Sequence, residues 1–413
     1  MELLASVFAE LSVADRIAAA LVCRPWRDSV FGSPRVWTNV YCRGTQQSAL
    51  AMVEMLRLSA QSPIRLSIVV SGENSETAID ALNDCLPRCS HLELMFDGTT
   101  ESHPDVREVL ECLAQPAPKL RSFWLHDPEM QYLNLDIAGD LHIFAGHAPQ
   151  LQSLLLNCDA STLALIDPAG LVTAKNVFVC HPTEMKTYHL TVLFRLVPCV
   201  VHLLLRVQQA DGAIDANDAI DVPRTLRSLD IVSEISESNA WLLLKHMKWQ
   251  HIHRVSLQPK GCYFTEADLL WFFHGTTGAQ PSAYSAWIDW EDDLLEMGNG
   301  VTLYISDIAA DDPHILLPRT YHGPEPSVSV PERSSFELVD PLPSSLFVNV
   351  TRLYLNELVF DPDCLRHPLP PLPAVVDLKI RMTTAHFIRH NLGISPFVVS
   401  SALLLYLFLD ICN

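Results

Sequence analysis

The sequence lacks the motifs that most cofactor-dependent and hydrolytic enzymes need. Glycine is scarce, at 15 of 413 residues, and no GxGxxG follows a predicted strand, so a Rossmann-type nucleotide site is not expected. P-loop, GxSxG, HExxH and protein-kinase motifs are also absent. No CxxC pair occurs among the 11 cysteines, which argues against a cysteine-ligated zinc. We therefore predict a binding protein with no enzymatic activity, no catalytic residues, no cofactor and no metal.

Positive charge is scarce as well. The chain has 28 basic and 48 acidic residues, which gives a formal net charge of −20. A chain this acidic repels a phosphate backbone, so nucleic acid is not expected as a partner. Scattered cysteines, together with charged residues that interrupt any signal peptide at the start, predict a reducing compartment, the cytoplasm or the nucleus.

Two groups of polar residues are candidates for chemistry. His251 and His253 point to the same side of a predicted strand, but no third ligand lies near them in sequence. A run of carboxylates over residues 289–293 contains no pair that the sequence sorts into an acid and a base. Surface histidines and a solvated acidic face are therefore the expected interpretations.

The start of the chain has a different pattern from the rest. Apolar residues at helical spacing predict three short helices, over residues 3–11, 17–22 and 26–31, and either Ser12 or Asp15 is suited to cap the second. A segment of about 40 residues cannot bury this much apolar surface by itself. The helices therefore either cap the first layer of a repeat domain or dock on another protein.

Residues 1–42 resemble the F-box family. The spacing in ALVCRPWR, residues 20–27, is the most specific match, and a Ser-Pro-Arg-Val-Trp extension follows at 33–37. The family usually opens with Leu-Pro just before the Glu-Leu-Leu of residues 2–4, and here only Met1 precedes these residues. The resemblance covers about a tenth of the chain.

The resemblance implies a partner and a role. F-box helices dock on a Skp-type adaptor, which joins a cullin scaffold carrying a ubiquitin-conjugating enzyme. The chain would then be the substrate-recognition subunit of a Skp–cullin–F-box E3 ubiquitin ligase. The residues expected to bind the adaptor are Leu3, Leu4, Val7, Phe8, Leu11, Leu21, Val22, Cys23 and Trp26.

A six-residue frame, apolar-x-x-apolar-x-apolar, returns along most of the remaining chain. Copies begin at residues 63, 89, 120, 151, 174, 200, 226 and 252, most often 26 residues apart, and later copies begin at 350 and 375. Helix-like stretches lie between several copies, at 104–113, 184–197 and 237–249. Leucine-rich repeats have such a frame and a period of about 20–29 residues. The chain thus also resembles the irregular leucine-rich-repeat domains that often follow an F-box.

The predicted fold is α/β. A short N-terminal helical F-box over residues 1–42 precedes an irregular leucine-rich-repeat solenoid over 43–390, with parallel strands on the concave face and helices outside. The asparagine that usually follows the frame is mostly missing, so uneven curvature is expected. The alternative for the same strand–helix units is a doubly wound sheet, whose strand order the sequence does not reveal.

A target protein would bind the concave face of the solenoid. Residues between the inward-facing positions of the frame point to that face. Tryptophan, tyrosine and arginine are the side chains that most often anchor protein interfaces. The residues predicted to contact the target, whose identity the sequence does not reveal, are Trp124, His126, Arg206, Asp230, Arg352 and Tyr354.

Three segments interrupt the repeat. Seven prolines punctuate residues 310–346 and predict a long loop, and the acidic, aromatic stretch 284–297 has no clear place in the repeat. Within the apolar tail 391–413, residues 392–409 are uncharged. We expect a buried final helix there; a membrane tail anchor and a gene-model artefact are the alternatives. The family resemblance implies no membrane partner.

Overall fold

The chain divides into two compact units, Met1–Lys260 and Gly261–Asn413. The histidine pair at 251 and 253, most of the proline-rich segment and the apolar tail lie outside the part of the chain that the structure describes. Within the described part, no helix is both long and apolar enough to cross a membrane. The computed structural model describes residues 2–97, 106–126, 142–157, 166–210, 220–233, 242–249, 252, 254–258, 284–291, 300–306, 319–322, 350–356 and 377–381.

The first unit begins with the predicted helical segment. Ser12, rather than Asp15, caps the second helix, since its hydroxyl oxygen accepts a hydrogen bond from the Asp15 amide at 3.2 Å. The third helix begins earlier than predicted, with Pro25 in its first turn, where a missing amide hydrogen costs nothing. The elements are α1 (Glu2–Ala9), α2 (Val13–Val22), α3 (Arg24–Gly32) and the 3-10 helix η1 (Pro34–Trp37).

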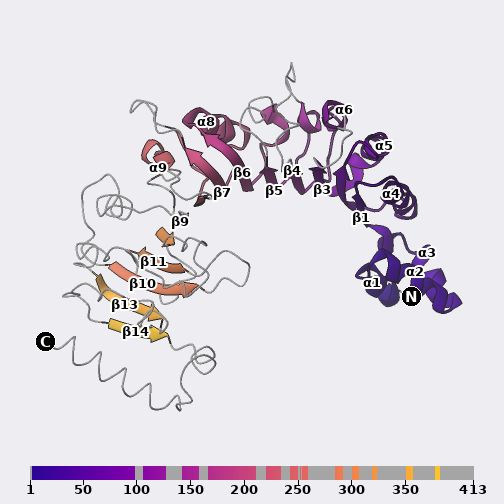
Figure 1. The fold of residues 1–413 in the computed structure, drawn as a ribbon, viewed down its shortest axis with the longest axis horizontal. Helices are drawn as coiled ribbons and strands as arrows, with labels where there is room; N and C mark the ends of the chain where they lie inside the picture. Colours follow the sequence, from indigo (N-terminus) through magenta and orange to yellow (C-terminus); the bar gives the residue numbers. More distant parts are fainter. Residues whose placement is uncertain are drawn as a thin grey trace, which may run out of the picture. The chain divides into compact units, whose positions relative to one another are not determined.

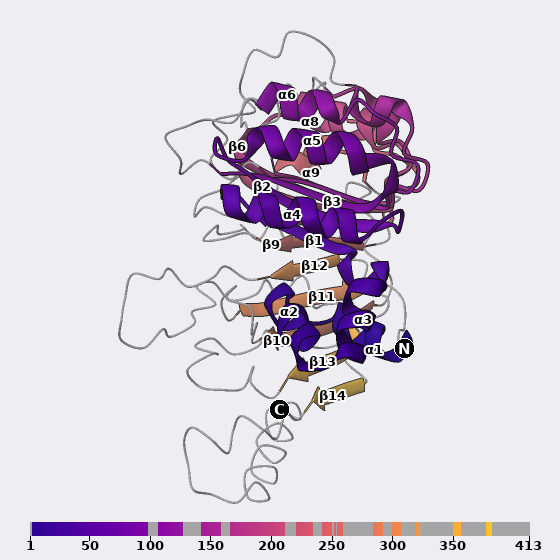
Figure 2. The same ribbon diagram turned by 90° about the vertical axis from the view of Figure 1, so that its right-hand side faces the viewer.

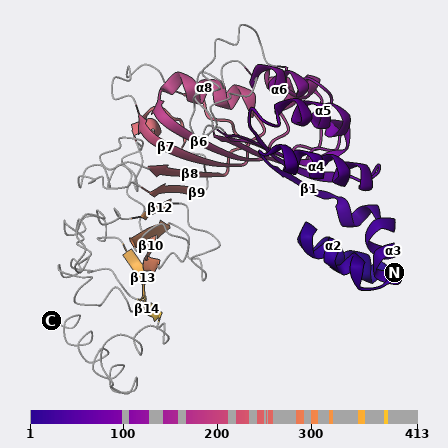
Figure 3. The ribbon, with the colours of Figure 1, turned by 45° about the vertical axis from the view of Figure 1, so that its right-hand side comes forward.

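Parallel strands follow, and each pairs with the next one along the chain (Figures 1 and 3). A doubly wound sheet reverses its strand order at a switch point, and these strands do not. The strands are β1 (Asn39–Arg43), β2 (Ile64–Val70), β3 (Cys89–Phe96), β4 (Ser122–His126), β5 (Ser153–Asn157), β6 (Asn176–Met185), β7 (His202–Ala210), β8 (Ser228–Ser233) and β9 (Arg254–Gln258).

The six-residue frame accounts for the strand register. The second position of each frame pairs with the second position of the next, as in Leu92 beside Phe123 and then Leu154, and all three side chains are buried. Strand β1 carries a further copy that was not predicted, at Trp37, Val40 and Cys42, 26 residues before the copy at 63. The repeat therefore begins inside the segment assigned to the F-box.

Helices α4, α5, α6 and α8 cover one face of this sheet, and no described helix covers the other, which we call the open face (Figures 1 and 2). The helix predicted at 184–197 begins later than expected, because β6 extends to Met185. In the stretch 237–249, the structure describes residues 242–249, and 242–246 of these are helical. The elements are α4 (Gln46–Leu58), α5 (Ser75–Cys85), α6 (Val106–Cys112), α8 (Thr187–Leu196), α9 (Leu242–His246), and the 3-10 helices η2 (Leu86–Arg88), η3 (Ile143–Gly146) and η4 (Pro168–Gly170).

The second unit departs from the all-parallel expectation. The connection from β10 to β11 has eight residues, fewer than the dozen or more that a parallel crossover needs, and the two strands are antiparallel. Strand β12 lies inside the predicted long loop and pairs antiparallel with β11. The order is β12-β11-β10-β13-β14, made by β10 (Tyr284–Glu291), β11 (Gly300–Ser306), β12 (Arg319–His322), β13 (Val350–Asn356) and β14 (Asp377–Arg381).

Candidate adaptor-docking and target-binding surfaces

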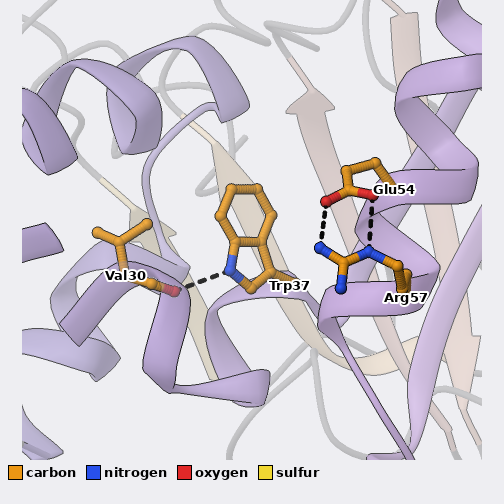
Figure 4. A network of polar contacts seen from close by, with 4 residues as sticks. All are labelled: Val30, Trp37, Glu54 and Arg57. Atoms are coloured by element: carbon orange, nitrogen blue, oxygen red, sulfur yellow. Dashed lines mark hydrogen bonds and ion pairs between the residues drawn. The ribbon is translucent and has the colours of Figure 1, made fainter. Parts of the chain in front are cut away.

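Aromatic residues hold the N-terminal helices together. Phe8 is 2% exposed and meets the ring of Trp26 edge-on, with 5.4 Å between centroids. The Trp37 indole donates a hydrogen bond to the Val30 carbonyl at 2.8 Å, as Figure 4 shows beside the Glu54–Arg57 ion pair of α4. These contacts fix α1, α3 and η1 as one body.

Two arginines bind the last carbonyl groups of the helix that comes before their own. Arg16 on α2 donates from Nε to the Phe8 carbonyl at 3.0 Å and from Nη2 to the Ala9 carbonyl at 2.8 Å, at the end of α1. Its guanidinium carbon lies 5.8 Å from the Trp37 ring centroid. Burial lowers the pKa of Arg16 from its usual value, although an arginine remains protonated at neutral pH. Arg27 on α3 donates to the Ala20 carbonyl near the end of α2.

The same packing leaves several apolar side chains of α1 and α2 in solvent. On α1, Leu3 is 83% and Val7 55% exposed; on α2, Leu21 is 71% and Val22 64% exposed. We call these four residues the apolar docking surface. Several exposed large apolar residues within one short helical segment are typical of protein-binding surfaces.

The nine predicted adaptor-binding residues divide between this surface and the interior. The exposed Cys23 follows the docking surface at the end of α2, and Leu4, Leu11 and Trp26 are half-buried. Phe8 is buried and supports the helices from inside. A helical segment that only caps the repeat would bury its apolar residues against the sheet. Leu3 and Leu21 are instead among the most exposed large apolar residues that the structure describes.

The open face of the sheet holds the second candidate surface. A cavity of about 250 Å³ lies over β1 to β4, and Tyr41, Ser67, Glu93 and Trp124 form one row across its floor. Strand alternation places them there, because their sequence neighbours in the frame face the helices. Of the predicted target-binding residues, only Trp124 lines this cavity, and it is 43% exposed.

The other predicted target-binding residues lie elsewhere. Asp230 lies in the same row as Trp124, but four strands further along the sheet. At the usual strand spacing, the two residues are roughly 19 Å apart. His126 shares a second row with Arg206 and lies 2.7 Å from the Asn157 amide nitrogen. Arg352 and Tyr354 belong to β13 in the second unit. The four predicted residues of the first unit therefore do not form one compact site.

Sequence reasoning missed most of the cavity. The predicted set does not include Tyr41, because it takes no frame in β1 into account. The spacing of Trp37, Val40 and Cys42 nevertheless matches the frame and places Tyr41 between two of its apolar positions. Arg65, His91 and Glu93 lie between the apolar positions of the two weaker frames, at 63 and 89. The described residues contain no cluster of three or more potential metal ligands.

Comparison with protein-family models matches residues 1–43 to the F-box-like domain. Domains of this type generally bind Skp-type adaptors, and F-box proteins are typically non-enzymatic. The match covers the apolar docking surface and ends on β1. It supports the F-box family for this segment and carries no information on the strands that follow. Comparison with curated proteins finds no match.

Proposed function

We propose that this chain is the substrate-recognition subunit of a Skp–cullin–F-box E3 ubiquitin ligase. The observation that carries the proposal is the apolar docking surface, which lies within the segment matched by the F-box-like domain. An adaptor that covers Leu3, Val7, Leu21 and Val22 removes apolar area from water, which supplies the free energy of docking.

In this proposal the strands beyond β1 form a leucine-rich-repeat solenoid that holds a target protein. Parallel strands paired in sequence order, with helices on one face, support that interpretation. The chain itself makes and breaks no bond. It brings lysines of the target close to the ubiquitin-charged enzyme on the cullin, and the gain in rate comes from effective concentration. A cytoplasmic or nuclear location follows from the same proposal.

The test is adaptor binding by charge-substituted chains. We expect Leu3→Asp and Leu21→Asp each to weaken the Kd for a purified Skp-type adaptor by about tenfold to a hundredfold, because a buried carboxylate would face apolar partner atoms. Isothermal titration calorimetry measures the Kd. Both side chains are exposed in the free chain, so neither variant loses internal packing.

Tyr188→Asp is the matched control, since Tyr188 is an exposed aromatic residue on α8, outside the F-box-like segment. We expect this variant to bind the adaptor like the wild type. Equal affinity of the wild-type chain and both leucine variants would overturn the docking proposal, as would no binding at all. The helices would then act only as a cap of the repeat.

A further inference from the structure

Three rows of residues on β1 to β8 face away from the helices, and the net charge of these rows has the opposite sign from that of the whole chain. Their acidic residues are Glu93 and Asp230. Their basic residues are Arg43, Arg65 and Arg206. A net charge of −20 on the chain makes this local excess of positive charge unexpected.

Three further cations stand at the starts of strands. Arg121 precedes β4, Lys175 precedes β6 and Arg227 precedes β8, and all three side chains are exposed. The Gln152 amide donates to the Arg121 carbonyl at 2.8 Å, and the Lys175 amide donates to the Gln152 carbonyl at 2.9 Å. Arg121 and Lys175 are therefore two strand spacings apart, roughly 10 Å.

Arg65, Arg121 and Lys175 make no ion pair with any residue in the described part of the chain. An arginine or lysine that stabilises the fold would usually be paired or would cap a helix, as Arg16 does. Burial and then the positive charges of Arg65 and Arg121 lower the pKa of His91, which lies in the cavity between them. The positive field of these two arginines thus reaches into the cavity.

Aromatic side chains also line the cavity. Tyr41 is 39% and Trp124 43% exposed, and both are on the floor of the cavity. The Arg43 guanidinium lies 5.5 Å from the Tyr41 ring centroid. Exposed tyrosine, tryptophan and arginine are the side chains that most often dominate the binding energy of protein interfaces.

We propose that the open face from β1 to β6 binds an acidic, unmodified segment of the target protein. An apolar or aromatic residue of the segment enters the cavity between Tyr41 and Trp124. Its Asp and Glu side chains meet Arg65, Arg121 and Lys175. Five strand spacings amount to roughly 24 Å, which about seven extended residues span. This inference rests on the proposed function, because it names the chemical class of the target that the subunit recognises.

Substitution of Glu93 distinguishes an acidic ligand from a basic one. Among the described residues that line the cavity, Glu93 is the one carboxylate, and it lies in the row between Ser67 and Trp124. For an acidic ligand Glu93 is repulsive, so Glu93→Gln tightens binding. For a basic ligand Glu93 would be the main attraction, and the same substitution would weaken binding.

The experiment is selection of a random library of twelve-residue peptides on the full-length chain, followed by fluorescence anisotropy with the most enriched peptide. We expect Asp and Glu to be enriched, and the Kd to rise about tenfold for Arg65→Glu and for Arg121→Glu. We expect Glu93→Gln to lower the Kd about threefold. Arg195→Glu, at an exposed position on the helix α8, is the control and leaves the Kd unchanged.

Selection of basic or uncharged peptides, or weaker binding by Glu93→Gln, would overturn the inference. Competition by a single-stranded DNA oligonucleotide at the same Kd would also overturn it, since the face would then recognise phosphate. Adaptor titration of the same preparation separates the two proposals, because Leu21→Asp changes adaptor binding and leaves peptide selection as in the wild type. Peptide binding by the wild-type chain at 50 and 300 mM salt tests the role of charge without any substitution. We expect a higher Kd at the higher salt.

Discussion

Arginines that bind the last carbonyl groups of an earlier helix recur along the first unit. Arg16 binds the end of α1, Arg27 the end of α2, and Arg88 donates to the Leu56 carbonyl at 3.1 Å at the end of α4. The last carbonyl groups of a helix have no partner within it and carry the negative end of its dipole. A guanidinium from a later element satisfies both the hydrogen-bonding and the charge requirement.

Arg16→Met tests whether these contacts stabilise the helical segment that we propose to dock the adaptor. The substitution removes two charge-assisted hydrogen bonds from a side chain that is 4% exposed, and we expect it to destabilise the helical segment by about 2 kcal/mol. That difference accelerates hydrogen exchange of the amides in residues 2–22 roughly thirtyfold. Mass spectrometry of deuterium uptake measures it.

Arg24→Met is the matched control, because the Arg24 side chain is 90% exposed and only meets Asp28 at 4.0 Å. We expect no more than about twofold faster exchange in the same peptides. Equal effects of the two substitutions would show that the contacts of Arg16 with α1 do not stabilise the segment.

At the scale of elements, the apolar frame made the strands predictable. Each predicted frame from 63 to 252 lies on one of β2 to β9, because a buried position recurs wherever a side chain must face the helices. The two short helices η3 and η4 had no such signal. Phe144 and Ala145 in η3 have φ of 59° and 47°, values that tertiary packing imposes against local preference.

Gly170→Ala tests that packing. A Cβ at Gly170 would collide with the Ile143 carbonyl group, so η3 and η4 could not approach each other as they do. We expect a loss of about 2–3 kcal/mol in the free energy of unfolding, measured by urea denaturation. Gly32→Ala is the control, because a Cβ there meets no atom within 4 Å. Equal stability of Gly170→Ala and the wild type would mean that η3 and η4 separate at no cost.

At the scale of the whole molecule, the two candidate surfaces differ in how local their sequence signal is. The residues proposed to dock the adaptor lie in one segment of fixed spacing, and the F-box-like match covers that segment. The cavity depends on register between strands 26 to 31 residues apart, and no local pattern shows that Tyr41, Glu93 and Trp124 share a row. Strands β11 and β12 lack the frame, whereas β10 has a weak copy at Ala283, Ala286 and Ile288 that is in register with the copy on β13.

The cysteines provide a readout of the adaptor complex in the whole chain. Cys23, at the end of α2, and Cys199, in the turn before β7, are exposed. Cys85 and Cys89 are buried 3.9 Å apart, and the neighbouring Cys85 thiol together with burial raises the pKa of Cys89 well above its usual value. Since the thiolate is the reactive form, iodoacetamide should label Cys23 and Cys199 and leave Cys85 and Cys89 unlabelled in the folded chain.

Adaptor binding should then protect one of the two exposed thiols. Cys23 adjoins Leu21 and Val22 of the apolar docking surface, whereas Cys199 lies between α8 and β7. With free adaptor at about 100 times the Kd, roughly one chain in a hundred is unbound, so labelling of Cys23 should slow by up to about 100-fold. The rate at Cys199 should not change, which makes it an internal control that needs no substitution. Protection of both thiols would indicate aggregation, and protection of neither would place the adaptor, if bound, away from the end of α2.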